Sequence, residues 1–429
     1  MMLVKLAGAL SVALLCVSPV LAQDSSGGID PALPVGPAAT PTFTTVYRFL
    51  GDANARWPRG GVFVTGNGEV FGTTLYDGDC STCGVVYRLT PPPKGKTVWT
   101  YKILKKFVLF KDGIGPTGPL AFYNGNLYGT TSAGGDTSCG CGTVFRISPT
   151  GVYKPLHVFK PSKQGSTPIS GLLIDKDGTM YGNTSAGGAH GSGIIYKLTQ
   201  AGGFSILYNF PGNFNGGPQG EMIFGRDGAI YGTQFGGGKY NQGLIFRITK
   251  GGSYSVLYNF KGVNQPGNST DGAQPEGRLV LGADGTIYGT TTFGGTPSGY
   301  GTAWSIKHVG TKWVYKQLYI FAGQGHNNDA NLPHSGFIAG PGGSLYGTGA
   351  GGGTYQSGAL YQLLPPKPGT ARWIYRTLHS FKGRDANGDT PYGDITSRLG
   401  TIYGMNLSGG HIGSGNCNDG CGTVFTYKP

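Results

Sequence analysis

A chain of 429 residues could hold two or three ordinary domains or one large repeat architecture. Its composition favours the repeat, because it has 82 glycines, 25 tyrosines and 21 phenylalanines, and only 12% charged residues against roughly 25% in an average globular protein. Such a mixture suits short strands and tight turns, and no window after the N-terminal segment has the apolar period of a helix. The formal net charge of +13 is spread along the chain and not gathered into a Lys/Arg stripe, which argues against a nucleic-acid-binding protein.

The N-terminal residues have the pattern of a secretory signal peptide. Lys5 precedes an apolar stretch over residues 6–17, and residues 20–22 resemble a cleavage site. Residues 1–22 would then be removed, leaving a Pro/Ala/Gly-rich leader over residues 23–42, expected to be flexible, and one domain over residues 43–429. No later stretch has the apolar length of a transmembrane helix. We therefore expect a monomer that is secreted, periplasmic or at the cell surface, with no membrane span.

An aromatic residue followed by glycine recurs at a spacing of 50 to 58 residues. The seven aromatic residues are Phe71, Tyr128, Tyr181, Tyr231, Tyr288, Tyr346 and Tyr403. Each copy contains four segments of strand length, as in residues 171–175, 179–184, 193–198 and 204–210. Asp-Gly dipeptides between the first two segments favour tight hairpins. The repeat predicts an all-β, seven-bladed β-propeller with four-stranded antiparallel blades.

The two ends of the chain predict how the ring closes. The seventh copy stops after its third strand, residues 422–427, whereas an additional strand, residues 44–49, precedes the first copy. The N-terminal strand would complete the last blade. Closure of this kind removes exposed sheet edges and ties the two chain ends together.

The repeats also carry a family pattern. Tyr-Gly-Thr-Thr is followed by Gly-Gly and then by Gly-Thr-Val-Phe, as at residues 128–131, 134–135 and 142–145. This pattern resembles the exported tandem-repeat family called GloVer over about residues 44–429. The resemblance implies export and surface anchoring, and it implies no agreed biochemical activity.

A proline precedes each first strand and aligns the seven copies at one end of the central channel. The prolines are Pro58, Pro116, Pro168, Pro218, Pro275, Pro333 and Pro391. The residues one position later should converge at the channel mouth, and they are Arg59, Thr117, Ile169, Gln219, Glu276, His334 and Tyr392. Three positions after the proline, Glu221, Arg278 and Asp394 replace small residues, and a charge is costly there unless it is paired or used.

Two interpretations of the mouth residues stay open. In the functional one, His334 and Tyr392 transfer protons, Arg59 and Arg278 bind a carboxylate, Glu276 contacts the ligand, and Glu221 or Asp394 is the acid or base. In the structural one, the same residues form salt bridges around water in the channel. Trp57, next to this group, would either stack on a sugar ring or pack within the fold.

The loops between second and third strands differ between blades. Three of them hold cysteine pairs, namely Cys80 and Cys83, Cys139 and Cys141, and Cys417 and Cys421. Short spacing in an exported chain favours three disulfides within the loops, with a zinc site from two neighbouring loops as the alternative. The fourth, fifth and sixth blades carry Tyr240, Tyr300 and Tyr355 instead, which would form a glycan platform or pack on their neighbours.

Aspartates recur four residues before the proline. Asp112, Asp271 and Asp329 are expected to cap turns by accepting backbone N–H groups. In the last such loop, Asp385, Asn387 and Asp389 alternate like the oxygen ligands of a calcium loop, although no bidentate glutamate follows. Calcium is therefore the one candidate cofactor, and none is required.

The sequence contains no nucleophile elbow, zinc-protease helix, phosphate loop or dinucleotide fingerprint. The leading hypothesis is a secreted propeller that binds a glycan or another extracellular polymer, expected to be acidic, on the face with the long inter-blade loops. The alternative is a carbohydrate-active enzyme, either a polysaccharide lyase or a glycoside hydrolase, with its site at the channel mouth. A structural protein of the cell envelope is the second alternative.

Overall fold

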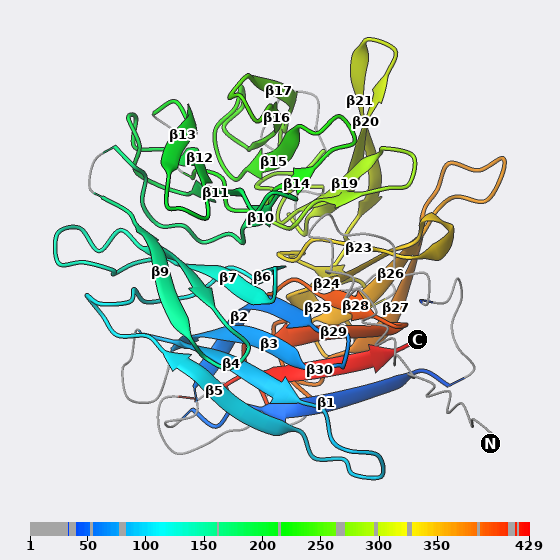
Figure 1. Ribbon diagram of the computed structural model, residues 1–429. Coiled ribbons are helices and arrows are strands. Elements are labelled where there is room, and N and C mark those ends of the chain that lie inside the picture. The colour runs from blue at the N-terminus through cyan, green and yellow to red at the C-terminus, as the bar shows by residue number, and fades with distance from the viewer. Residues whose placement is uncertain are drawn as a thin grey trace, which may run out of the picture.

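The computed structural model describes residue 33 and residues 40–51, 55–76, 83–160, 163–212, 216–262, 271–295, 299–323, 328–383, 387–410, 417 and 420–429. Regular structure in these ranges is β except for one 3-10 turn, Pro341–Gly343. The described residues contain seven four-stranded antiparallel sheets arranged as a ring of blades (Figure 1). The predicted seven-bladed propeller is confirmed. The segments assigned to the signal peptide lie outside the described residues.

The blades follow one another along the chain, and each is a meander. Blade 1 contains β2 (Arg56–Val64), β3 (Val70–Tyr76), β4 (Val85–Thr90) and β5 (Thr100–Lys106). Blade 2 contains β6 (Ala121–Tyr123), β7 (Asn126–Thr131), β8 (Thr143–Ile147) and β9 (Tyr153–Val158). Blade 3 contains β10 (Leu173–Ile174), β11 (Met180–Thr184), β12 (Ile194–Leu198) and β13 (Phe204–Asn209). Blade 4 contains β14 (Ile223–Phe224), β15 (Ile230–Gln234), β16 (Leu244–Ile248) and β17 (Tyr254–Asn259).

The second half of the ring repeats this arrangement. Blade 5 contains β18 (Val280–Leu281), β19 (Ile287–Thr291), β20 (Thr302–Val309) and β21 (Lys312–Ile320); blade 6 contains β23 (Ile338–Ala339), β24 (Leu345–Gly349), β26 (Ala359–Leu364) and β27 (Ile374–Ser380). Blade 7 contains β28 (Thr396–Arg398), β29 (Thr401–Asn406), β30 (Thr423–Lys428) and the N-terminal β1 (Thr42–Arg48). A short pair, β22 (Ala330–Asn331) with β25 (Gly351–Gly352), lies in the loops of blade 6.

The glycine of each aromatic-Gly pair makes room for an aromatic ring. In every blade this glycine pairs across the sheet with the aromatic residue of the third strand, as Gly289 does with Trp304. A Cβ atom on Gly289 would overlap the indole ring, and the same holds in the other six blades. The seven third-strand rings are completely buried, and they are Tyr87, Phe145, Tyr196, Phe246, Trp304, Tyr361 and Phe425. The sequence repeat is thus the repeat of one packing unit.

A phenylalanine after each fourth strand joins neighbouring blades. These residues are Phe49, Phe107, Phe159, Phe210, Phe260, Phe321 and Phe381, and none is more than 2% exposed. Each donates its N–H to the glycine that precedes a third strand, at 3.0 to 3.1 Å. Phe49 makes this bond to Gly422, so the N-terminal strand occupies the same place as its six counterparts. Blue β1 accordingly runs beside red β30 in Figure 1, which confirms the predicted closure.

The inner segments are packed more tightly than the sequence suggested. The expected inner strand over residues 171–175 reduces to Leu173–Ile174, because the preceding segment packs against the backbone of its neighbours instead of pairing within the blade. A Cβ on Gly118, for example, would overlap the carbonyl of Ser170 in the next blade. The residue before the proline also bonds across the junction, as Trp57 N–H does to Cys421 O at 2.8 Å.

One residue of the predicted leader is buried. Leu33 is 2% exposed and packs in a cluster with Ile338, Tyr346 and Phe425 of blades 6 and 7. This leucine lies within residues 23–42, so at least this point of the leader contacts the ring.

Candidate functional site

The seven residues that follow the prolines line one cavity at the channel mouth. The mouth cavity is bounded by these residues, Arg59, Thr117, Ile169, Gln219, Glu276, His334 and Tyr392, together with Glu221 and Asp394. Each blade contributes one side chain from its entry into the inner segment. The cavity has a volume of about 80 Å³. The positions that align in the repeats therefore meet in the folded protein, even where they lie 333 positions apart in the chain, as Arg59 and Tyr392 do.

Four of these side chains form a continuous chain of contacts. Arg59 donates from Nη2 to the Tyr392 hydroxyl at 3.1 Å, and its guanidinium lies 4.7 Å from the centre of the same ring. The ring of Tyr392 stacks on His334 with centroids 4.2 Å apart. His334 Nδ1 pairs with the carboxylate of Glu276, which also accepts a bond from Thr292 at 3.1 Å. Blades 7, 6 and 5 thus hold these groups against the arginine of blade 1.

The Glu276–His334 contact fixes the orientation of the imidazole. When Nδ1 carries the proton that Glu276 accepts, Nε2 is left as the basic nitrogen of the ring. The two side chains are 10% and 17% exposed, so the pair is shielded from bulk water. Sequence reasoning assigned Glu276 to ligand contact and missed this pairing. The signal was present, since residues 276 and 334 hold the same position in consecutive repeats.

The carboxyl groups deeper in the mouth have fixed partners. Glu221 lies 3.8 Å from the Arg278 guanidinium, and Arg278 also donates to Ile395 O at 3.4 Å. Asp394 accepts the backbone N–H of Gly336 at 2.8 Å. Burial, and to a smaller extent the negative charge of Asp394, raise the pKa of Glu221, whereas Arg278 lowers it; the net result is a pKa of about 8.

Arg59 differs from Arg278 in its surroundings. Among the described residues, no carboxylate lies within ion-pair distance of Arg59, whereas Arg278 faces Glu221. One guanidinium nitrogen of Arg59 is used by Tyr392, and the side chain is only half-buried. Burial and the charge of Glu276 raise the pKa of Tyr392, so its hydroxyl keeps its proton near neutral pH. The mouth therefore presents the Arg59 guanidinium and the Tyr392 hydroxyl beside the carboxyl groups of Glu276, Glu221 and Asp394.

The size of the mouth cavity limits what can enter it. Pockets that enclose a small ligand measure roughly 300–1,000 Å³, several times more than the 80 Å³ found at the mouth. A space of this size is too small to enclose a whole sugar ring.

The other predicted ligand residues do not line the mouth cavity. Trp57 packs edge-on against Tyr76, with centroids 5.1 Å apart, and Arg56 lies beside both rings. Tyr300 packs under Gly323, and Tyr355 is 51% exposed beside Lys382. Tyr240 lies near Lys239. No ring contact joins the three tyrosines in the described part of the chain, and a shared glycan platform stays a prediction.

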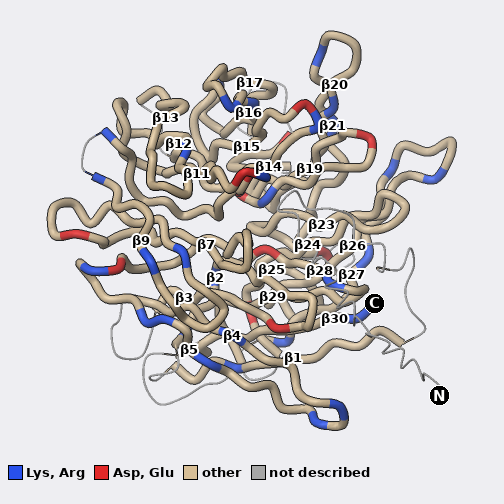
Figure 2. The backbone as a smooth tube through the Cα atoms, in the orientation of Figure 1, with Lys and Arg blue, Asp and Glu red and all other residues tan. Residues whose placement is uncertain are grey.

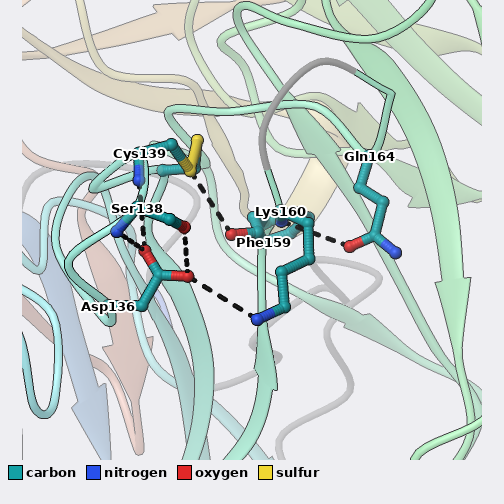
Figure 3. The surroundings of a disulfide bond; sticks show 7 residues. Asp136, Ser138, Cys139, Phe159, Lys160 and Gln164 are labelled. Atoms are coloured by element: carbon teal, nitrogen blue, oxygen red, sulfur yellow. Dashed lines mark hydrogen bonds and ion pairs between the residues drawn. A yellow bond between two sulfur atoms is a disulfide. The ribbon is translucent and has the colours of Figure 1, made fainter.

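Two of the three expected disulfides are present. Cys139 bonds Cys141, and Cys417 bonds Cys421. Cys83 is disulfide-bonded as well, and its predicted partner Cys80 lies outside the described residues. Disulfide formation removes these five thiols from the alternative zinc site. In the loop of Figure 3, Asp136 accepts the N–H groups of Ser138 and Cys139 at 3.1 and 3.3 Å, which holds the turn around the Cys139–Cys141 disulfide.

The candidate calcium loop is described only in part, because Asp385 lies outside the described residues. Asn387 accepts the N–H of Lys382 at 2.7 Å and contacts His379 Nε2 at 2.8 Å. Asp329 and Asp271 accept loop N–H groups in the same way, at 3.2 and 3.1 Å. Asn387 stands four residues before Pro391, so it is the counterpart of these capping aspartates. A calcium ion would have to compete with this cap, and the site stays a prediction.

Lys and Arg are scattered around the ring in Figure 2, as the sequence indicated. No helix among the described residues is long and apolar enough to cross a membrane. Within the same residues, no group of three or more His, Cys, Asp or Glu side chains is placed to hold a metal ion.

The fold and the mouth define a seven-bladed propeller with a polar channel entrance. The profile of the Gloeobacter/Verrucomicrobia repeat matches residues 35–192 and 168–425. The chain belongs to this repeat family, which confirms the GloVer resemblance. A search of curated proteins finds no match.

Solved structures share the fold at low sequence identity. PorZ, a bacterial surface component of the type-IX secretion system of Porphyromonas gingivalis, matches with a TM-score of 0.52 and 12% identity, over 92% of this chain and 48% of PorZ. An aldose sugar dehydrogenase from Streptomyces coelicolor matches with a TM-score of 0.41 and 13% identity, over 91% and 100% of the chains. A putative glucose dehydrogenase from Thermus matches with a TM-score of 0.40 and 14% identity, over 90% and 100%. These likenesses are of fold alone.

Proposed function

We propose that this protein is exported and binds an acidic glycan or a similar anionic polymer at the mouth of its channel. The observation that carries the proposal is Arg59, a half-buried guanidinium at the mouth with no carboxylate partner among the described residues. Arginine binds carboxylates through parallel N–H bonds, and its charge does not depend on pH in the physiological range. A carboxylate of the polymer would complete the pairing that the fold leaves open.

The surroundings of Arg59 support this assignment. The Tyr392 ring fixes one side of the guanidinium, so little side-chain freedom is lost when an anion binds. A cavity of about 80 Å³ suits a carboxylate better than the sugar ring that carries it. A ligand would therefore be held by its acidic group while the rest of the polymer lies across the inter-blade loops. Export agrees with the disulfides at Cys139–Cys141 and Cys417–Cys421, which persist in oxidising compartments.

A polysaccharide lyase is the second candidate, and the Glu276–His334 pair favours it. A lyase needs a base to take the proton next to a uronate carboxylate and a cation to neutralise that carboxylate. His334 Nε2 and Arg59 would supply these two groups, with Tyr392 between them. The hydrolase version fits less well, because Asp394 and Glu221 are engaged by Gly336 and Arg278.

A panel of acidic and neutral polysaccharides tests the proposal. Polygalacturonate, hyaluronan and alginate are compared with dextran for retention by the immobilised protein, and the eluates are assayed for unsaturated and reducing ends. Retention of an acidic polymer without new ends supports the binding function. New unsaturated ends that His334→Gln abolishes establish the lyase, and the absence of both retention and products contradicts both.

A further inference from the structure

A second cavity lies between blades 4 and 5, at the opposite end of the strands from the mouth. It is bounded by the β14–β15 hairpin of blade 4 and by both hairpins of blade 5, and the residues that matter here are Arg226, Asp227, Tyr231, Arg247, His308 and Trp313. This interblade cavity has a volume of about 540 Å³. Its size is within the range of pockets that enclose a small ligand, roughly 300–1,000 Å³, whereas the mouth cavity is far below it.

The cavity exists because blade 5 has a long outer hairpin. Strand β20 continues past Ile306 to Val309, and the β20–β21 hairpin projects beyond that of blade 4 in Figure 1. The extension places Trp313 against Tyr231 of blade 4, with ring centroids 5.6 Å apart. His308 lies beside the indole at 5.0 Å. An aromatic wall is thereby built across the blade junction.

The corresponding tryptophan of blade 6 shows what simple packing looks like. Trp373 lies two residues before Tyr375 on β27, as Trp313 lies before Tyr315 on β21. Trp373 is 9% exposed in a core cluster and does not line the smaller cavity of about 300 Å³ beside it. Trp313 also packs against a core cluster, that of blades 4 and 5, but it is only partly buried and forms part of the wall of the larger cavity. The aromatic face in blade 5 is thus available to a ligand.

Polar groups converge on the same cavity. Asp227 is paired with Arg247 at 2.6 Å and accepts the Tyr231 hydroxyl at 3.0 Å, which fixes three hydrogen-bonding side chains on one side. Arg226 reaches across to the carbonyl of Ala283 in blade 5 and, in the described residues, has no carboxylate within ion-pair distance. Two arginines against one aspartate give this wall a net positive charge.

We propose that the interblade cavity binds a pyranose ring that carries a carboxylate, such as a hexuronate residue. The apolar face of the sugar would stack on Trp313, over Leu281 and Ile287. The carboxylate would meet Arg226, and the hydroxyls would bond to Asp227 and Arg247. This site is independent of the mouth, because it lies on the other face and uses none of the same residues.

The test is a titration with glucuronic acid, galacturonic acid and glucose in an Arg59→Gln background, which removes the mouth as a binding site. Trp fluorescence and isothermal calorimetry report binding. Saturable uronate binding that weakens at least tenfold in both Trp313→Ala and Arg226→Gln supports the proposal, and Trp99→Phe, at the corresponding position of blade 1, is the control.

Three results would overturn it. The site is excluded if uronates show no saturable binding at concentrations up to about 50-fold above a millimolar dissociation constant, which is on the order of weak sugar affinities. Binding that survives both substitutions places the ligand elsewhere. Glucose binding as tight as uronate binding contradicts the acidic ligand class. Arg226→Gln is an exposed change, so its result holds even where Trp313→Ala alters the hairpin.

Discussion

Phe49 tests whether the N-terminal strand closes the ring. This residue belongs to the last blade but packs on blade 1, with its ring 5.3 Å from Tyr87 and 6.0 Å from Tyr101. It is completely buried. Truncation of a buried phenylalanine to alanine costs about 3–5 kcal/mol, through lost burial and the cavity left behind. Because the free energy of unfolding of natural proteins is about 5–15 kcal/mol, Phe49→Ala should remove a large part of the total stability.

A matched variant, Phe210→Ala, shows how large a loss of stability to expect. Phe210 occupies the same position between blades 3 and 4, is equally buried, and makes the same backbone bond at 3.1 Å. Urea unfolding of the purified protein, followed by fluorescence, gives the midpoint and slope for both alanine variants. We expect the two losses to agree within about 1 kcal/mol, since both lie in the same packing unit. A normal midpoint for Phe49→Ala beside a lowered one for Phe210→Ala would refute the closure.

Other predictions follow from the packing and from the titrating groups. Gly289→Ala should cost about 1–3 kcal/mol because its Cβ overlaps Trp304, whereas Gly251→Ala, whose nearest neighbour is 3.8 Å away, should change the urea midpoint little. Burial lowers the pKa of His157 to about 4. As the pH falls from 6.5 to 4, the unfolded chain therefore takes up a proton before the folded chain does, and stability is lost. The substitution His157→Phe should reduce this loss in melting curves recorded across the same pH range. The pKa of Glu221 is raised to about 8, so the folded state keeps a proton that the unfolded chain releases above pH 4.5, and stability falls as the pH rises to 8. Glu221→Gln should therefore melt at a higher temperature than the wild type at pH 8. If the difference in melting temperature between the two proteins is the same at pH 5 and pH 8, the raised pKa is contradicted.

The repeat was readable from the sequence because its causes are steric and local. Only glycine can face the Trp304 ring across the sheet, so the aromatic-Gly pairs mark one position in every blade. The additional strand at the N-terminus and the missing one at the C-terminus then required closure. The same alignment also predicted that Arg59 and Tyr392, in the first and last repeats, would meet at the mouth.

The specific partners at the mouth were not readable. Spacing brings Glu276 and His334 into neighbouring blades, but whether they pair depends on side-chain rotamers and on the width of the channel. The shortness of the inner strands, such as Leu173–Ile174, also follows from three-dimensional crowding of backbones around the axis. Asn387 illustrates a third limit. Its side-chain oxygen caps a turn, whereas the alternation of Asn387 with neighbouring acidic residues in the sequence suggested a calcium loop.

The interblade cavity carried no motif. Asp227 and Tyr231 come from blade 4 and Trp313 comes from blade 5, and the cavity depends on the extension of one hairpin. Sequence alignment of the repeats shows that extension but not the space beneath it.

The most direct test of acidic-glycan binding at the mouth is the dissociation constant of polygalacturonate for Trp313→Ala, which removes the proposed interblade site, and for the same protein with Arg59→Gln added. Both are measured at constant salt because charge contacts are screened. Arg376→Gln added to the same protein, at an exposed arginine on β27, is the control for general loss of positive charge. The proposed function predicts at least tenfold weaker binding when Arg59→Gln is added and unchanged binding when Arg376→Gln is added. Equal affinity of all three proteins would contradict the assignment of the mouth as the binding site.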